Sequence, residues 1–460
     1  MGGLLQTLGI ASNALTADQG ALEVTSNNIA NANTPGYSRE QADLVEETPV
    51  QIGNLLYGQG VSLQSIQSIS DPVLQLSIQQ ETSTQGQLNS FTNTMDQVQS
   101  LFNEADGVGL QSGLSQFFDS LQSLSADPTS TSLGQAVLSA AQDLTTTFQQ
   151  TSSSLTQIQT GLNQNVTEDV TQINQLTSQI AQVDGQIESL QSQGGDTGTL
   201  ADQKTQLVNQ LSGLVGLTVT NNASGNYTLA TQNGSLLVVG NQSFNLETQL
   251  NSATGMQDVY SNGNDITPTI TQGDLGGLIQ ARDTSIPDAL NSLNTLAYNL
   301  VNAFNTQSTA GYDSSGSAGV NFFTPLTSVT GAASQISVAI TNPSQIATSS
   351  DGTAGSNGNV LALAAIQNQP IVSGESVTDY YSNFVDNIGN QISSADGQQQ
   401  TATAVMQQLQ TQLTSVSGVS IDQEAANLVL YQQAYQASAE VITAVNALLA
   451  TTMNMLGPGG

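Results

Sequence analysis

Both ends of the chain carry apolar residues at a constant seven-residue spacing, and this pattern limits the fold more than any other feature of the sequence. Toward the N-terminus the repeated positions are Leu8, Leu15, Leu22 and Ile29. Toward the C-terminus they are Ile421, Leu428, Tyr435, Ile442, Leu449 and Leu456. A strict seven-residue repeat keeps one apolar seam facing a partner helix and implies a left-handed supercoil. We therefore expect two terminal helices that pair as a coiled coil; the alternative is two amphipathic helices packed on a globular core.

The composition excludes most catalytic and nucleic-acid-binding classes of protein. The 460 residues include 3 Lys or Arg, 35 Asp or Glu and no His or Cys, so the formal net charge is −32. Zinc, haem and iron–sulfur sites, and Ser–His or Cys–His nucleophiles, are therefore excluded, and we expect no cofactor. The cations are Arg39, Lys204 and Arg282. They are too few to neutralise a row of phosphates, so we expect no nucleic-acid partner and no anionic lipid partner.

Pairs of carboxylates are the catalytic apparatus that this composition leaves. A glycosidase needs two of them, one on each side of a sugar bond. The candidates are Asp422 with Glu424, and Glu46 with Glu47. The first two stand two residues apart on an expected helix, so they do not share a face, and the second two fall in an expected loop. We expect no enzymatic activity, and a secreted acidic glycoside hydrolase is the less favoured alternative.

The apolar runs are too short for a membrane helix. Val360–Ile366 is among the longest, whereas a membrane span needs about 20 residues. The first residues also lack the basic segment of a standard signal peptide. We expect no membrane insertion and, if the protein is exported, a route without a cleaved signal.

The N-terminal helix has a readable end. The stretch from Asn27 to Tyr37 alternates Asn with small residues and then reaches Thr34, Pro35 and Gly36. Asn competes for backbone hydrogen bonds, Pro disfavours the helical conformation of the preceding residue, and Gly supplies a turn. Strand-like alternation follows, and it predicts a hairpin over about 37–69.

The middle of the chain alternates between helical and strand patterns. Apolar spacing predicts an antiparallel pair of helices over 173–190 and 200–214. Short β-prone runs predict strands at 217–220, 227–230 and 236–239, with a turn at Asn233-Gly234 between the last two. Further helices are expected over 286–304 and 376–416, and a strand over 336–340 within a segment rich in Gly, Ser and Asn.

The expected fold class is mainly α with inserted β, in which a central helical bundle and smaller β-rich outer domains separate the two heptad helices. The N-terminal axial helix and hairpin would occupy 1–75, and the C-terminal axial helix 418–460. The helical domain would comprise 76–216, 272–306 and 376–417. The outer segments would be a β-rich one at 217–271 and a β or irregular one at 307–375.

Three parts of the sequence carry a resemblance to a known family. The stretch Asn27–Tyr37 resembles the N-terminal motif of bacterial flagellar rod, hook and hook-associated proteins, and 418–439 resembles their C-terminal motif. In the middle, 200–207 and 273–283 resemble the hook-associated protein 1 family of the hook–filament junction. The chain departs from the family pattern at Ser68 and Lys204, where the family usually carries Arg, and at Gln423, where it usually carries an acidic residue.

The resemblance implies a structural protein of the bacterial flagellum that connects hook to filament and is needed for filament assembly. Family members bind an export chaperone in the cytoplasm and leave through the flagellar type III channel. They form a homo-oligomeric ring at the extracellular hook, between the hook protein and a second hook-associated protein. The alternative is another axial protein, hook or distal rod. The axial subunit interface would comprise the heptad positions together with Asn27, Asn28, Ile29, Asn31, Thr34, Pro35, Gly36 and Tyr37.

Overall fold

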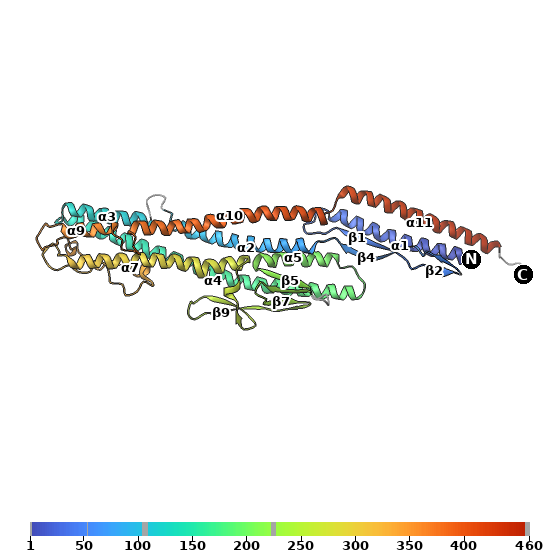
Figure 1. The fold of residues 1–460 in the computed structure, drawn as a ribbon, viewed down its shortest axis with the longest axis horizontal. Helices are drawn as coiled ribbons and strands as arrows, with labels where there is room; N and C mark the ends of the chain where they lie inside the picture. The colour runs from blue at the N-terminus through green and yellow to red at the C-terminus, as the bar shows by residue number, and fades with distance from the viewer. Residues whose placement is uncertain (1, 53, 104–108, 222–226, 456–460) are drawn as a thin grey trace.

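The computed structural model describes residues 2–52, 54–103, 109–221 and 227–455, and it shows an elongated, mainly helical molecule (Figure 1). Two parts follow one another along its length. We call residues 2–71 and 418–455 the terminal arm, and residues 72–417 the central body. The arm contains both ends of the described chain, whereas the body contains the long helices and the β-sheets of the middle of the sequence.

The terminal arm consists of two helices and a β-ribbon. Helix α1 (Gly2–Asn31) and helix α11 (Ile421–Met455) run antiparallel, side by side (Figure 1). Strands β1 (Glu40–Glu46) and β4 (Val61–Ser68) form the antiparallel ribbon, which ends in the short pair β2 (Val50–Ile52) and β3 (Leu55–Tyr57). The predicted end of the N-terminal helix and the predicted hairpin are thereby confirmed.

The central body is built from nine helices of very different length in its described part. They are α2 (Pro72–Ser100), α3 (Leu110–Ala126), α4 (Thr131–Ser192), α5 (Gly198–Leu214), α6 (Gly273–Gln280), α7 (Ile286–Ala310), α8 (Ala332–Gln335), α9 (Gly358–Ala365) and α10 (Val377–Ser417). Helix α10 packs along α2, and α4 turns back as α5 (Figure 1). The predicted antiparallel helix pair is confirmed, although α4 begins far upstream of the seam that indicated it. A π-helical turn, Ala281–Ser285, joins α6 to α7 just before Pro287, which has no N–H to continue the α-helical ladder.

Two antiparallel sheets lie against one side of α4 (Figure 1). One contains β5 (Leu217–Asn221), β6 (Tyr227–Thr231), β7 (Leu236–Val239) and β8 (Gln242–Ser243) in sequence order. The other contains β9 (Leu246–Leu250), β10 (Gln257–Ser261) and β11 (Asn264–Asp265). The three predicted strands are confirmed, and Gly234 turns between two of them with φ of +87°.

The main hydrophobic core lies entirely in the central body. It runs from Leu88 to Ala402 and includes no residue of α1 or α11 among those described. Phe117, Phe304, Phe322 and Phe323 meet near its centre, with ring centroids 4.9 to 5.9 Å apart. Phe322 and Phe323 belong to the Gly-rich segment 307–375, so this segment is anchored in the same core despite its irregular backbone.

The strand predicted over 336–340 is wrong. Residue 338 forms a single isolated bridge with Phe323, flanked by the backbone bonds Thr324 N to Ser337 O and Ala339 N to Phe322 O. Helix α8 ends at Gln335, directly before this segment, and the backbone N–H and C=O of Phe323 bond to the side chain of Asn305 instead of to a strand. The fold class is confirmed as mainly α with inserted β. The division into seven segments stays a prediction.

A buried carboxyl pair gives the body a predictable response to pH. Asp169 of α4 is 6% exposed, and burial together with the neighbouring carboxyl of Asp274 raises its pKa to about 7. The pKa of Asp169 is higher in the folded than in the unfolded state, so ionising this buried carboxyl costs stability. That cost is absent at low pH, grows as the pH rises above the unfolded pKa, and is complete above the folded pKa. Replacing Asp169→Asn should therefore raise the free energy of unfolding by about 2–4 kcal/mol near pH 8 and leave it nearly unchanged near pH 4.

Urea-induced unfolding of both proteins across this pH range would measure the difference. Asp143→Asn is the matched control, since it removes an exposed carboxylate of the same helix that does not act on Asp169. If the stability of the wild-type and Asp169→Asn proteins changed equally with pH, the pKa of Asp169 would not be raised in the folded protein.

Candidate functional site

Each of the three basic side chains of the protein pairs with a carboxylate. Arg39, at the start of the ribbon, lies 3.9 Å from Glu424 of α11, measured from Nη1 to Oε1. Lys204 of α5 lies 3.0 Å from Asp184 of α4, and its Nζ is 4.1 Å from the centroid of the Tyr227 ring. Arg282 pairs with Asp283 in the π-helical turn. The three cations thus connect the ribbon to α11, connect α5 to α4, and hold the π-helical turn.

The two terminal motifs meet in one polar group, which we call the Asn28 cluster: Asn28, Tyr37, Arg39, Glu40, Asp202 and Glu424. Asn28 is 1% exposed and stands at its centre. Its Nδ2 donates to the Glu40 carbonyl at 2.8 Å and to Glu424 Oε2 at 3.3 Å. Its Oδ1 accepts from the Tyr37 hydroxyl at 2.8 Å and from the Glu40 N–H at 2.9 Å. One amide therefore connects α1, the ribbon and α11.

The cluster also joins the terminal arm to the central body. The Ser38 N–H donates to Asp202 Oδ2 of α5 at 2.8 Å, and Gln206 Nε2 of α5 donates to the Pro35 carbonyl at 2.9 Å. The Arg39 N–H donates to the carbonyl of Ser417, the last residue of α10, at 2.9 Å. These three bonds fix the turn after α1 against the ends of two body helices, so the cluster forms the joint of the molecule.

Carboxylates outnumber cations at this joint. Burial raises the pKa of Glu40, with Asp196 and Asp202 adding to the effect, and burial also raises the pKa of Asp202. Burial and the surrounding carboxylates likewise raise the pKa of the Tyr37 hydroxyl. The neutral forms of Glu40 and Asp202 therefore persist to higher pH than is usual for carboxyl groups, and acid should strengthen the joint.

The structure places the residues predicted from the N-terminal motif in different environments. Asn28 is buried and Tyr37 is half-buried, and both have their polar groups engaged within the chain. Asn31 is half-buried, and Asn27, Thr34, Pro35 and Gly36 are exposed. The motif thus holds the joint together with its buried members. A subunit interface remains a prediction for the exposed members.

The C-terminal heptad positions lie on the face of α11 that is turned toward α1. Leu428, Tyr435, Ile442 and Leu449 are half-buried there. They alternate with Glu424, Tyr431, Ser438, Val445 and Thr452, which are also buried or half-buried. We call this face, from 424 to 452, the inner seam. Ile421 is 53% exposed and lies outside the inner seam, and Leu456 lies outside the described residues.

Sequence reasoning missed the small residues that form the buried face of α1. The predicted Leu8, Leu15, Leu22 and Ile29 are only half-buried, whereas the most buried apolar side chains of this helix are Ala11, Ala17, Ala21 and Val24. The sequence does carry a helical pattern for this face, because steps of three and four separate Ala14, Ala17, Ala21, Val24 and Asn28. Small residues let two helices approach closely, and Ser438 Oγ reaches Asp18 Oδ2 at 3.3 Å across the contact.

A second apolar line runs along α11 on the side away from α1. It consists of Leu430, Ala437, Val441, Ala444 and Leu448, all exposed, at steps of seven, four, three and four. We call it the outer stripe. Leu430 and Leu448 are 59% and 56% exposed. Helical periodicity places these residues on one face, and within the described part of the chain no other element covers that face.

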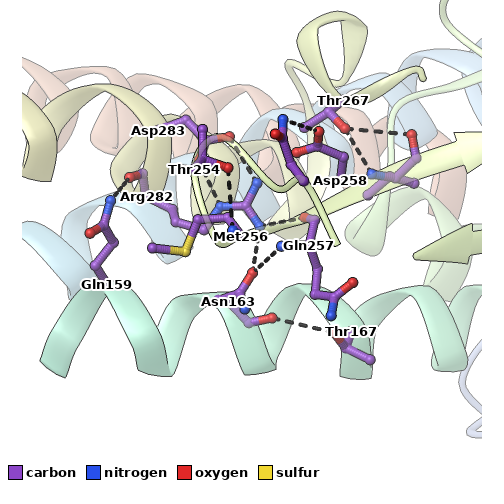
Figure 2. Close-up of polar contacts among 12 residues, drawn as sticks. Gln159, Asn163, Thr167, Thr254, Met256, Gln257, Asp258, Thr267, Arg282 and Asp283 are labelled. Atoms are coloured by element: carbon purple, nitrogen blue, oxygen red, sulfur yellow. Dashed lines mark hydrogen bonds and ion pairs between the residues drawn. The ribbon is translucent and has the colours of Figure 1, made fainter. Parts of the chain in front are cut away.

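Arg282 anchors the β-region to the helices of the body (Figure 2). Its guanidinium is fully buried and donates to Asp283 Oδ1 at 2.7 Å and Oδ2 at 2.8 Å, to the Gln257 carbonyl of β10 at 2.7 Å, and to Asn163 Oδ1 of α4 at 3.1 Å. Gln159 Nε2 of α4 donates to the Arg282 carbonyl at 2.9 Å. One side chain thus ties together a long helix, a strand and the π-helical turn.

The predicted carboxylate pairs do not form a catalytic constellation. Glu424 is 3% exposed and is engaged by Asn28 and Arg39, whereas Asp422 is exposed on another face of α11. Glu46 is the last residue of β1, whereas the sequence predicted a loop at this position. In the described residues, no group of three acidic side chains is placed to hold a metal ion, and no helix is long and apolar enough to span a membrane.

Three family profiles match successive parts of the chain. Residues 8–37 match the flagella basal body rod protein family, and residues 410–455 match the C-terminal family of the flagellar basal body rod proteins FlgEFG. Between them, residues 95–323 match the helical domain of the flagellar hook-associated protein FlgK. The two terminal matches cover the helices of the arm, and the central one covers most of the body.

Curated relatives match over nearly the whole chain. Flagellar hook-associated protein 1 of Bacillus subtilis (strain 168) is 29% identical over 98% of both chains. The protein of that name from Salmonella typhimurium is 26% identical, over 97% of this chain and 99% of its own. Among solved structures, the flagellar hook junction protein FlgK from Burkholderia pseudomallei superposes with a TM-score of 0.67 at 19% identity, covering 74% of this chain and 100% of that chain. The last likeness concerns the fold alone.

Proposed function

The chain belongs to the flagellar hook-associated protein 1 family, and on that premise we propose that it is the structural subunit that joins hook to filament and on which the filament assembles. As a member of this family it is a structural protein of the bacterial flagellum. The family profile of its helical body favours this role over that of a hook or rod protein, which share only the terminal motifs.

One observation supports the assembly role most strongly: for its size, the terminal arm exposes far more large apolar side chains than the central body does. Of the twenty large apolar side chains that are exposed in the described residues, eleven lie in the arm, which is less than a quarter of the chain. They include Leu430, Val441 and Leu448 of the outer stripe and the tip of the ribbon, where Leu55 and Leu56 are 62% and 73% exposed. Apolar surface concentrated in this way is typical of a surface that a partner covers.

We propose that neighbouring copies of the chain cover this surface in a homo-oligomeric ring. The arms would then form the inner layer around the axis, and the bodies would face outward. The hook protein would lie below the ring and a second hook-associated protein above it. These contacts would involve the outer stripe and the exposed motif residues Asn27, Thr34, Pro35 and Gly36.

Two further steps belong to the proposal. Before assembly, a cytoplasmic export chaperone would bind the chain and keep it from associating through its apolar arm. Export through the flagellar channel would then deliver it to the extracellular end of the hook. The absence of Cys in the sequence suits this route, because no thiol can cross-link the chain on the way.

We also propose that the protein performs no catalysis. The alternative of a secreted acidic hydrolase needs two carboxylates on either side of one sugar bond. Glu424, one of the four carboxylates named from the sequence, is engaged in the Asn28 cluster instead. A muramidase assay on the purified protein, set beside a known muramidase, would detect activity if this interpretation were wrong.

Hooks isolated without filaments provide a direct test of the proposed role. The purified protein, added to such hooks, should bind at their distal end and appear there as an extra cap in electron micrographs. A control variant that lacks residues 418–460, and therefore α11, should leave the hook ends bare. Binding along the sides of the hook, or no binding at all, would count against the proposal.

A further inference from the structure

Glu40 has no cationic partner at the joint between terminal arm and central body. Arg39, the nearest cation in sequence, is directed to Glu424, with Nη1 3.9 Å from Oε1. Lys204 is directed to Asp184 at 3.0 Å. Glu40 is nevertheless 4% exposed, so its charge, when present, is buried among other carboxylates. Burying an unpaired charge is costly, and such a group favours its neutral form.

The two oxygens of Glu40 differ in their surroundings. Oε2 accepts a hydrogen bond from Asn27 Nδ2 at 3.3 Å, whereas Oε1 is buried and has no hydrogen-bond partner among the described residues. A Cβ added to Gly198, the first residue of α5, would lie 2.5 Å from Glu40 Oε1 and 3.4 Å from Asp196 Oδ1. Both carboxyl groups therefore border the space beside Gly198, and both line the same surface cavity.

The charged and titratable groups around Glu40 come from every element that meets at the joint. They are Glu23 of α1, Tyr37 and Arg39 before β1, Asp196 in the turn between α4 and α5, Asp202 of α5, and Glu424 of α11. Burial is the main cause that raises the pKa of Glu40, Asp196 and Asp202 add to it, and the Asn27 hydrogen bond opposes it.

The two protonation states of Glu40 have opposite effects on this contact. When ionised, the carboxylate repels Asp196 and Asp202, which belong to the central body. When protonated, the carboxyl loses this repulsion, and its Oε1–H becomes a donor on the side of the joint where Asp196 lies, in the turn between α4 and α5. The proton therefore removes one repulsion across the joint and supplies a donor there.

We propose that Glu40 and Asp196 form a proton-operated clasp that fastens the terminal arm to the central body in acid and loosens it as pH rises. The arm then keeps one orientation relative to the body under acidic conditions and samples several when Glu40 is ionised. The proposal goes beyond the junction role, because a junction subunit could perform that role with a joint that ignores pH.

Double electron–electron resonance on the full chain tests the clasp. The protein contains no Cys, so spin labels on Gln182→Cys of α4 and Gln432→Cys of α11, both exposed positions, report the distance between body and arm. In the wild-type background we expect the distance distribution to be about twofold broader near pH 8 than near pH 5. Glu40→Gln supplies an amide donor at both pH values and should keep the distribution narrow throughout.

Two further variants make the test decisive. Asp196→Asn offers a donor to the ionised Glu40 and should also give a narrow distribution at both pH values. Glu46→Gln removes a carboxylate of the same type from an exposed position of the same strand, and it should behave like the wild type. A distribution that has the same width at both pH values in the wild type would overturn the proposal. So would Glu40→Gln and Asp196→Asn variants that broaden with pH as the wild type does.

Discussion

Replacing Leu430 and Leu448 together by glutamate is expected to abolish filament attachment while leaving the monomer folded. Both side chains lie on the outer stripe and are more than half exposed, so the monomer loses little by the change. If neighbouring subunits cover the stripe, each leucine contributes roughly 1.5–3 kcal/mol to the contact. The double variant should then weaken association by at least about a hundredfold.

The control for this experiment is the double variant Gln432→Glu and Gln436→Glu. It adds the same two charges to exposed positions of α11 that lie away from the outer stripe. Motility and electron microscopy of complemented cells would report attachment, and circular dichroism of the purified monomers would report folding. Filaments on cells that carry the stripe variant would show that the stripe is not an assembly surface.

Replacing Arg282→Met is expected to cost about 3–5 kcal/mol of the stability of the central body. The methionine fills most of the volume but leaves the carbonyl of Gln257 without its charged donor at a position where the Arg282 side chain is fully buried. Removing one partner of a buried charged network leaves the others unsatisfied, which is the main part of the cost. Hydrogen exchange should rise first in the strands around 246–261, which Arg282 connects to α4 (Figure 2).

Replacing the partly exposed Arg39 by methionine provides the comparison. Arg39→Met removes a cation that is 25% exposed and 3.9 Å from its carboxylate, so it should change the urea-induced unfolding of the body by less than about 1 kcal/mol. If the two variants destabilised the body equally, the buried network around Arg282 would not have the importance assigned to it.

The sequence predicted the regular parts of the fold well, because they depend on local patterns. The heptads located both terminal helices, and on α11 they identified the face that meets α1. On α1 the same reasoning named residues that are half-buried, and it missed the most buried ones. A large apolar residue gives a strong periodic signal, whereas Ala17 and Ala21 give a weak one, although closely packed helices favour small side chains.

The joint could not be predicted from the sequence, because its partners are far apart along the chain. Asn28 looked like a residue that ends a helix, and its amide is instead shared between Glu40 and Glu424, which are 12 and 396 positions away. Arg282 was noticed only as one of three cations. Its burial depends on the approach of α4 and β10, which only the tertiary structure brings together.

Deletion of the gene, followed by electron microscopy of the flagella, tests the central claim most directly. Cells without the protein should assemble hooks of normal length that carry no filament, and the intact gene supplied on a plasmid should restore filaments. The Leu430→Glu, Leu448→Glu variant should fail to restore them although the protein is made. Filaments of normal length on the hooks of the deletion strain would contradict the assignment of this chain to the hook–filament junction.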